Sequence, residues 1–422
     1  MTEHLQPQLR PLEVLPVGSE DLPLYLFRDP EGFGEPVVLT PNGTILAMLM
    51  DGERTLAGIQ AAFCVQTGGQ VPLTDLEAVV RELDTARLLA NERFETYRRE
   101  LIDAYLSNPV RPASHAGGAY AEEPDELRKE LDECFTCDEG PGPIDFDAPA
   151  DGRQLHGLIA PHIDLARGGP AFAWAYKQVI EQSSADLFVI FGTAHNGLEE
   201  WFGISRKDFN TPLGVVPTDR AFIDRLAEHL ASSVAGRQLD LFADELAHRM
   251  EHSIEFQAVF LQHVLGGRRK FKIVPILVDS FQDFLLDGGT PDGSPEVQAF
   301  VAAVRAAAQR HSGKVCYISA ADFAHIGRHF GDPWLVDRQR LAGQEADDRK
   351  LLAAAGRCDA AALFDHIAGQ SDRSRICGLA PTYTMLEIIH PSRGELLKYD
   401  QAVEEDGTSC VSFASMAFYP LS

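Results

Sequence analysis

Histidines follow two short apolar segments of this chain, at the point where each segment ends. His195 comes shortly after the run 187–191, and His162 comes shortly after the run 157–160. Continuous apolar runs rich in β-branched and aromatic residues are typical of strands that are buried on both faces of a parallel sheet. In open α/β sheets, ligands bind beyond the carboxyl ends of the strands. If both strands belong to one sheet, we expect the two imidazoles to meet at one edge.

Two further apolar runs end in the same way. Residues 273–278 lead into Asp279, and residues 315–319 lead into Asp322 and His325. A carboxylate can orient an imidazole, which can then move a proton near neutral pH, so we interpret Asp322 and His325 as an acid/base pair. The alternative is that Asp322 caps a helix that follows the strand.

A thiol joins the histidines as a candidate metal ligand. Imidazole and thiolate together suit copper, zinc or iron. Cys377 stands shortly before a helix predicted to begin at Pro381, and helix N-termini favour the thiolate, which is the ligating form. A single His or Cys is more often structural, so the prediction that His162, His195 and Cys377 bind a metal depends on the strand-end positions of the histidines.

Another spacing suggests a different metal. His248, Glu251 and His252 form an HxxEH pattern inside residues 246–264, which we predict to be one long helix. On a helix, His248 and His252 would share a face. This is a zinc motif of hydrolases in which Glu251 would act as general base. A CxxC pair at Cys134 and Cys137 is predicted to be two thiols near a helix end, because no second pair stands at zinc-finger spacing.

Strands and helices alternate from residue 155 onward. This predicts an α/β fold with a central, mostly parallel sheet flanked by helices. We assign this domain to residues 108–422, since Pro109, Pro112 and the Gly-Pro run 140–143 mark loops after a preceding segment. Residues 1–107 are predicted to be an irregular lead-in over 1–20, followed by a small winged-helix-like domain of short helices and extended pieces.

The composition limits the classes of partner. The chain has 422 residues, 45% of them hydrophobic, and a formal charge of −26. Such an acidic surface disfavours nucleic acid or an anionic membrane as the main partner, although it leaves room for a local basic patch. No apolar run reaches the ~20 residues of a membrane helix, and residues 1–7 lack a signal-peptide pattern, so we expect a cytoplasmic protein.

Several short blocks, in order, resemble the Memo family over about residues 110–422. The blocks are residues 111–117, 160–162, 192–195, 211–214, 251–255, 319–325 and 377–378. The resemblance implies the fold of LigB-like class III extradiol dioxygenases, which use non-haem iron. It also implies that His162, His195 and Cys377 are the metal ligands, that His325 beside Asp322 is the acid/base residue, and that His252 lines the same pocket.

A second resemblance concerns residues 22–95. The stretch Asp51-Gly52-Glu53-Arg54-Thr55-Leu56, with the hydrophobic pattern around it, is similar to PqqD-like modules, which bind leader peptides or dock partner enzymes. Together the two resemblances imply a Memo component of the AmmeMemoRadiSam system, with radical SAM and Amme-type partners.

The sequence therefore favours a Memo-like, metal-binding redox protein. We expect an oxidoreductase or dioxygenase dependent on non-haem iron or copper, with zinc less expected, that acts on a small molecule or a modified peptide. One alternative is a non-catalytic, peptide-binding adaptor. The third hypothesis is an HxxEH zinc hydrolase.

Overall fold

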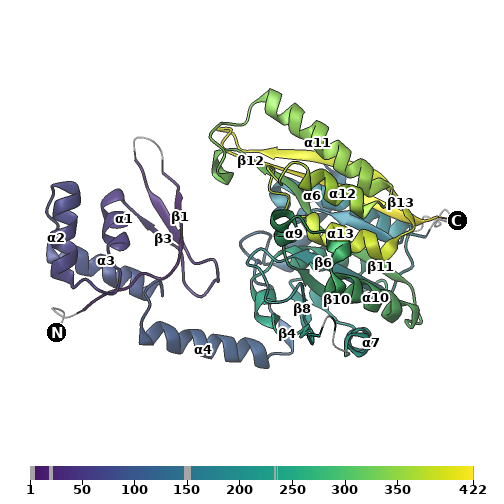
Figure 1. Cartoon of the computed structure of the whole chain (residues 1–422), viewed down its shortest axis with the longest axis horizontal. Coiled ribbons are helices and arrows are strands. Elements are labelled where there is room, and N and C mark those ends of the chain that lie inside the picture. Colours follow the sequence, from purple (N-terminus) through teal and green to yellow (C-terminus); the bar gives the residue numbers. More distant parts are fainter. Residues whose placement is uncertain (1–4, 19–21, 147–153, 232–233, 235, 422) are drawn as a thin grey trace. The chain divides into compact units, whose positions relative to one another are not determined.

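The chain divides into two compact units, Met1–Ser107 and Asn108–Ser422. The computed structural model describes residues 5–18, 22–146, 154–231, 234 and 236–421 (Figure 1). No helix among these residues is both long enough and apolar enough to cross a membrane.

The first unit combines a small antiparallel sheet with helices. Its elements are β1 (Glu13–Pro16), β2 (Tyr25–Arg28), β3 (Val37–Leu39), α1 (Pro41–Met48), α2 (Leu56–Thr67), α3 (Leu73–Thr85) and α4 (Glu92–Ser107). The Thr55 hydroxyl caps α2 by accepting from the backbone N–H of Gly58. Phe27, Ile59 and Leu83 are fully buried in the shared core.

The predicted irregular lead-in is wrong for part of residues 1–20. Glu13 to Pro16 form β1, which pairs antiparallel with β2, and Glu13 also forms an ion pair of 2.6 Å with Arg28 across the ladder. The prolines of this segment made a strand hard to recognise from the sequence. The strand forms because β1 pairs with β2, which lies further along the chain. The PqqD-like resemblance of this unit stays a prediction.

The second unit is built on an eight-stranded sheet within the described residues. Its strands are β5 (Gly157–Ala160), β6 (Leu187–Thr193), β7 (Phe202–Ile204), β10 (Lys272–Val278), β11 (Val315–Ala320), β12 (Asp322–Ile326), β13 (Ser392–Val403) and β14 (Cys410–Pro420). The order is β12-β14-β5-β11-β6-β10-β7, with β13 paired to β14. The α/β class is confirmed. The sheet is mixed, because only the four strands β5, β11, β6 and β10 pair parallel.

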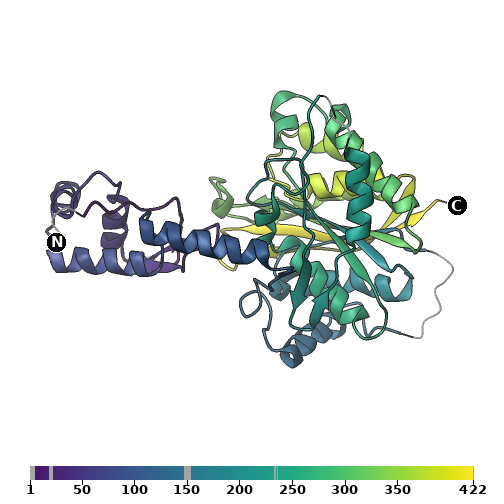
Figure 2. The ribbon, with the colours of Figure 1, turned by 90° about the horizontal axis from the view of Figure 1, so that it is seen from below.

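Helices cover both faces of this sheet (Figure 2). The helices of this unit are α5 (Pro124–Thr136), α6 (Leu165–Glu181), α7 (Arg220–Leu230), α8 (Ser253–Leu265), α9 (Gln282–Asp287), α10 (Pro295–Gln309), α11 (Arg338–Gly356), α12 (Ala360–Ala368) and α13 (Leu379–Ile389). Successive side chains of β6 point to opposite layers: Leu187, Val189 and Phe191 pack with α7, α10 and α13, whereas Phe188 and Ile190 pack with α6 and α8. Burial on both faces explains the continuous apolar run of this strand.

Short elements complete the unit. They are the small sheet of β4 (Val110–Arg111), β8 (Asp208–Thr211) and β9 (Gly214–Val216), and the 3-10 turns η1 (Glu245–Arg249), η2 (Pro291–Gly293) and η3 (Arg328–Phe330). The single helix predicted over 246–264 is wrong. The chain forms η1, leaves helical hydrogen bonding at 250–252, and begins α8 at Ser253.

Candidate functional site

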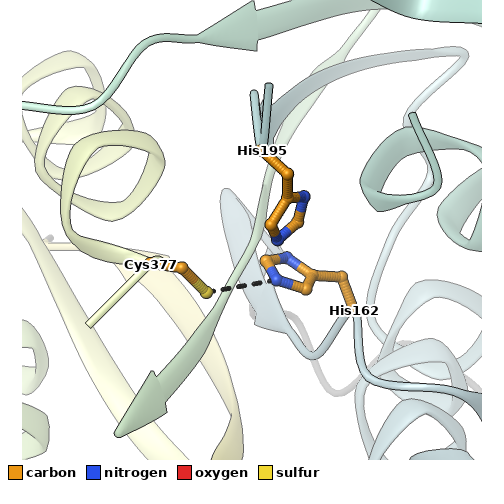
Figure 3. A group of neighbouring side chains, drawn as sticks. All are labelled: His162, His195 and Cys377. Atoms are coloured by element: carbon orange, nitrogen blue, oxygen red, sulfur yellow. Dashed lines mark hydrogen bonds between the residues drawn. The ribbon is translucent and has the colours of Figure 1, made fainter. Parts of the chain in front are cut away.

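Three side chains that are far apart in the sequence meet at the carboxyl edge of the parallel strands. One ligand atom from each of His162, His195 and Cys377 lies within 4.8 Å of the others, and His162 Nε2 is 3.2 Å from Cys377 Sγ. Figure 3 shows the two imidazole rings next to each other, with the thiol pointing at His162. His162 follows β5, His195 follows β6, and both strands pair parallel with β11. Cys377 reaches the same place from the turn before α13.

Each imidazole has one nitrogen held by the protein. His162 Nδ1 is 3.0 Å from the carbonyl oxygen of Ala320, which can only accept, so Nδ1 carries a proton and Nε2 is left for the site. His195 Nδ1 is 3.1 Å from both carboxylate oxygens of Glu251. Such partners fix the tautomer and ring orientation of a metal-ligating histidine. The two rings are therefore arranged in the way that a metal site requires.

Glu251 holds this arrangement together, a role that the sequence analysis missed. Its carboxylate also accepts from the backbone N–H of His195 at 3.0 Å and of Ser253 at 2.9 Å. Burial by itself would raise the pKa of Glu251, but the neighbouring imidazoles of His195 and His252 lower it well below its usual value. The carboxylate is thus charged and its oxygens are already engaged.

The HxxEH interpretation is wrong in its geometry. His248 lies in η1, its Nε2 is 3.1 Å from the carbonyl oxygen of Gly203, and burial lowers its pKa to about 3. His252 lies just before α8, with its ring 4.7 Å from that of His195 and 5.5 Å from that of His162. The break between η1 and α8 removes the shared helical face. His252 therefore belongs to the same site as His162 and His195, and His248 does not.

Asp322 and His325 both lie on β12, but they do not pair directly. Asp322 Oδ1 accepts from the backbone N–H of His162 at 3.0 Å, and Oδ2 lies 3.7 Å from His162 Nε2. His325 Nδ1 instead lies 3.1 Å from the carbonyl oxygens of Phe323 and Arg375. Asp322 is therefore the partner of His162. The helix-capping alternative for Asp322 is also wrong, because a strand rather than a helix follows it.

The site holds opposite charges in close contact. Burial would raise the pKa of Cys377, but the charges of His162 and His325 lower it to about 5, so the thiolate is the form at neutral pH. Burial would likewise lower the pKa of His162, but the Asp322 carboxylate and the Cys377 thiolate raise it to about 9. A proton on His162 Nε2 and a metal cation would compete for the same atoms.

His252 provides a neutral group beside these charges. Burial is the main reason that its pKa falls to about 3, and the nearby imidazoles of His195, His162 and His115 add to this, whereas Glu251 opposes it. A neutral imidazole of such low basicity can donate a hydrogen bond through one ring nitrogen and accept one through the other.

A buried arginine braces the segment that carries Glu251 and His252. The Arg111 guanidinium is fully buried and forms an ion pair of 2.7 Å with Glu255. It also donates to the carbonyl oxygens of His248 at 2.6 Å and Glu251 at 2.8 Å. Sequence reasoning gave Arg111 and Glu255 no role, although both stand in the blocks that resemble the Memo family.

A cavity opens beside two of the three candidate ligands, His195 and Cys377. It has a volume of about 180 Å³, and its lining includes His195, Cys377, Phe281, Asp279 and Asp372. A cavity of roughly 150 Å³ is enough to hold benzene. Asp279, the residue that follows β10, therefore lies at this site, as its strand-end position predicted. The arrangement can hold a small organic molecule next to a bound cation.

The CxxC pair lies elsewhere. Cys134 is buried in α5, and burial is the main cause that raises the pKa of its thiol to about 12. Cys137 is the C-cap residue of the same helix. The structure therefore agrees with two thiols near a helix end.

Comparisons with known proteins agree with the resemblance. The model of a family described as "Memo-like protein" matches residues 111–417. A MEMO1 family protein of Aquifex aeolicus is 29% identical over 418 residues, which cover 98% of this chain and 100% of that protein. MEMO1 family proteins of Methanopyrus kandleri and Methanosarcina barkeri are 29% and 28% identical, cover 73% and 71% of this chain, and match over 98% and 95% of their own lengths. The similarity to the Aquifex protein thus extends into both units.

Proposed function

Because this chain belongs to the Memo-like protein family, we propose that its larger unit binds one redox-active metal ion through His162, His195 and Cys377. The proposal includes an oxidoreductase activity on a small molecule or a modified peptide. The observation that carries it is the convergence of two oriented imidazoles and one thiolate within 4.8 Å at the carboxyl edge of the sheet.

The donor set favours iron or copper. Two imidazoles suit iron, copper or zinc, and a thiolate adds a soft donor that favours copper or an iron centre unlike that of a carboxylate-ligated enzyme. The remaining ring nitrogens already have protein partners in Ala320 and Glu251, which supports a preformed site. The low pKa of Cys377 supports the proposal further, since the ligating form needs no separate deprotonation step.

The surrounding residues have separate tasks in this proposal. A bound iron or copper ion would supply one-electron chemistry and a place for oxygen. The cavity beside His195 and Cys377 would hold the organic molecule and limit its size. His252, neutral at physiological pH and stacked on the His195 ring, would offer a hydrogen bond at the metal site, while Glu251 keeps His195 in place.

Metal content tests the proposal. We expect wild-type protein, purified without oxygen and supplied with iron(II) or copper(I), to retain about one ion per chain. His195→Ala should lose that ion, because the variant keeps only two ligands. His229→Ala is the matched control, since His229 is exposed in the last turn of α7. Oxygen uptake with catechol-like compounds would follow for the loaded wild type.

The opposite result has a clear meaning. If neither the wild type nor His229→Ala retains either metal, the redox proposal is wrong. The peptide-binding adaptor then becomes the leading function, and binding of peptides by the full chain is the next measurement.

A further inference from the structure

A second and larger cavity lies at the opposite edge of the sheet. Asp186, Lys272 and Ser312 line it, and they stand at or just before the starts of β6, β10 and β11. These strands run parallel and in register, with Leu187 aligned to both Lys272 and Val315. The candidate metal ligands instead follow strand ends. The cavity has a volume of about 670 Å³, which is in the usual range for small-molecule sites.

The lining of this cavity is basic, although the chain as a whole carries a formal charge of −26. Five cationic side chains line it, against two carboxylates. The cations are Arg225, Arg269, Lys270, Lys272 and Arg310, and the carboxylates are Asp186 and Asp219. A local field of this sign, inside an acidic protein, would concentrate anions at the cavity.

Both carboxylates already have partners. Asp219 caps α7 by accepting from the backbone N–H of Phe222 at 2.9 Å, and it lies 3.4 Å from the Lys272 ammonium. Asp186 accepts from the backbone N–H of Lys314 at 2.9 Å and lies 3.3 Å from His311. These two charges can offset only part of the positive charge of the lining, which holds five cations.

Three of those cations have no ion pair with any residue that the structure describes, namely Arg225, Arg269 and Lys270. The Arg269 guanidinium does donate to the backbone carbonyl oxygens of Ser183 and Val179. The Nε atoms of Arg225 and Arg269 are buried and have no hydrogen-bond acceptor within the described part of the chain. These two atoms are covered by the protein, so a bound molecule would contact the outer guanidinium nitrogens and the Lys270 ammonium instead. A phosphate or carboxylate group would supply the negative charge that these cations lack.

Helix ends account for only part of the pattern. Arg269 and Arg310 follow the C-termini of α8 and α10, where cations are favoured by the helix dipole. Arg225, however, lies in the middle of α7, and Lys272 begins β10. These two positions have no such explanation.

Apolar and backbone surfaces complete the lining. Phe271 and Pro217 contribute apolar atoms, and Gly266 and Gly267 contribute bare backbone. A Cβ at Gly266 would lie 2.3 Å from the carbonyl oxygen of Gln262, so a side chain there would force the turn after α8 to move. The cavity therefore combines charge with room for an uncharged part of a molecule.

We propose that this basic cavity binds a small phosphorylated molecule of about nucleotide size, at a site separate from the candidate metal centre. Arg225, Arg269 and Lys270 bind its phosphate groups, and the surface around Phe271 contacts the remainder. The proposal does not depend on metal binding at His162, His195 and Cys377.

Calorimetric titration of the full-length chain tests it, with ATP and inorganic pyrophosphate as probes at low ionic strength and without added metal. We expect saturable binding of both, tighter for the probe with more charges, and weaker as salt is added. Arg225→Gln and Lys270→Glu should each weaken binding by about tenfold or more, because each removes a charge-assisted contact. Arg393→Glu, at an exposed position on β13, is the control for net charge and should bind like wild type.

Three results would overturn the proposal. The first is that wild type binds neither probe at probe concentrations up to about 1 mM, which is roughly the weakest dissociation constant expected of a dedicated site. The second is equal loss of binding in Arg393→Glu and Lys270→Glu, which would indicate general charge effects. The third is binding of hexaglutamate but of neither phosphate probe, which would assign the cavity to an acidic protein segment. Thermal melting of each variant confirms that it is folded before titration.

Discussion

Replacing Glu251 by Gln should loosen the candidate metal site without changing any proposed ligand. The Glu251 carboxylate accepts from His195 Nδ1 and from the backbone N–H groups of His195 and Ser253, all at 2.9–3.1 Å. A Gln side chain has one oxygen and one NH₂ group, so at least one of these donors would face another donor. Because Gln also lacks the negative charge, the His195 ring loses its strongest orienting contact.

The size of the effect follows from that contact. A hydrogen bond to a charged group contributes about 1.5–3 kcal/mol. Each 1.4 kcal/mol corresponds to about a tenfold change in an equilibrium constant, so Glu251→Gln should weaken metal binding by roughly 10- to 100-fold. Loss of a hydrogen-bond partner behind a metal-ligating histidine typically has an effect of this order.

Competition against a chromophoric chelator measures the affinity for iron(II) or copper(I). Asp348→Asn is the matched control, because Asp348 is a fully buried carboxylate whose partners, Gln344 and Tyr399, lie outside the site. Glu251 has no such role if Glu251→Gln binds metal within threefold of wild type, or if Asp348→Asn loses as much affinity as Glu251→Gln. Thermal melting of the metal-free variants separates a local effect from general unfolding.

Three further predictions concern neighbouring residues. Burial would raise the pKa of Glu255, but contacts with Arg111 and His115 lower it to about 2. The ionised carboxylate therefore stabilises the folded state fully above about pH 4.5, and this contribution is lost as the pH falls toward 2. Urea unfolding should therefore show a gap of about 3 kcal/mol between wild type and Glu255→Gln at pH 6 that narrows in acid; a constant gap would contradict this. Gly378→Ala should lower the free energy of unfolding by about 1–3 kcal/mol, because its Cβ would lie 2.3 Å from the carbonyl oxygen of Asp322; an unchanged urea midpoint would contradict the close packing. Cys377→Asp should weaken copper(I) binding far more than iron(II) binding, because it replaces a soft donor by a hard one, and parallel losses in chelator competition would argue against Cys377 as a ligand.

The positions of the histidines could be predicted from the sequence because they depend on strand ends. The apolar runs before His162 and His195 are buried on both faces, which is the property that makes such strands recognisable. Parallel pairing through β11 then brings both histidines to one edge. For Cys377, the residue type and the following helix were visible, but its approach to the site depends on the turn before α13.

Contacts made by turns were not predictable in the same way. Residues 246–264 have a nearly continuous helical pattern, so the break that turns Glu251 toward His195 left no periodic signal. The spacing of Asp322 and His325 suggested that they pair. The register of β12 against β14 shifts between these two residues, and their side chains contact different groups. The basic cavity draws its cations from α7, β10 and the segments after α8 and α10, and the overall negative charge concealed it.

Arg111 has a consequence for the order in which the larger unit folds. Its guanidinium donates to the carbonyl oxygens of His248 and Glu251, which lie 137 and 140 positions further along the chain. Closing loops of that length costs conformational entropy before any bond is made, and such non-local contacts slow folding. Until they form, Arg111 remains hydrated and the turn that carries Glu251 and His252 has no brace. We therefore expect this turn to gain protection from hydrogen exchange only once Arg111 has met the segment that carries Glu251.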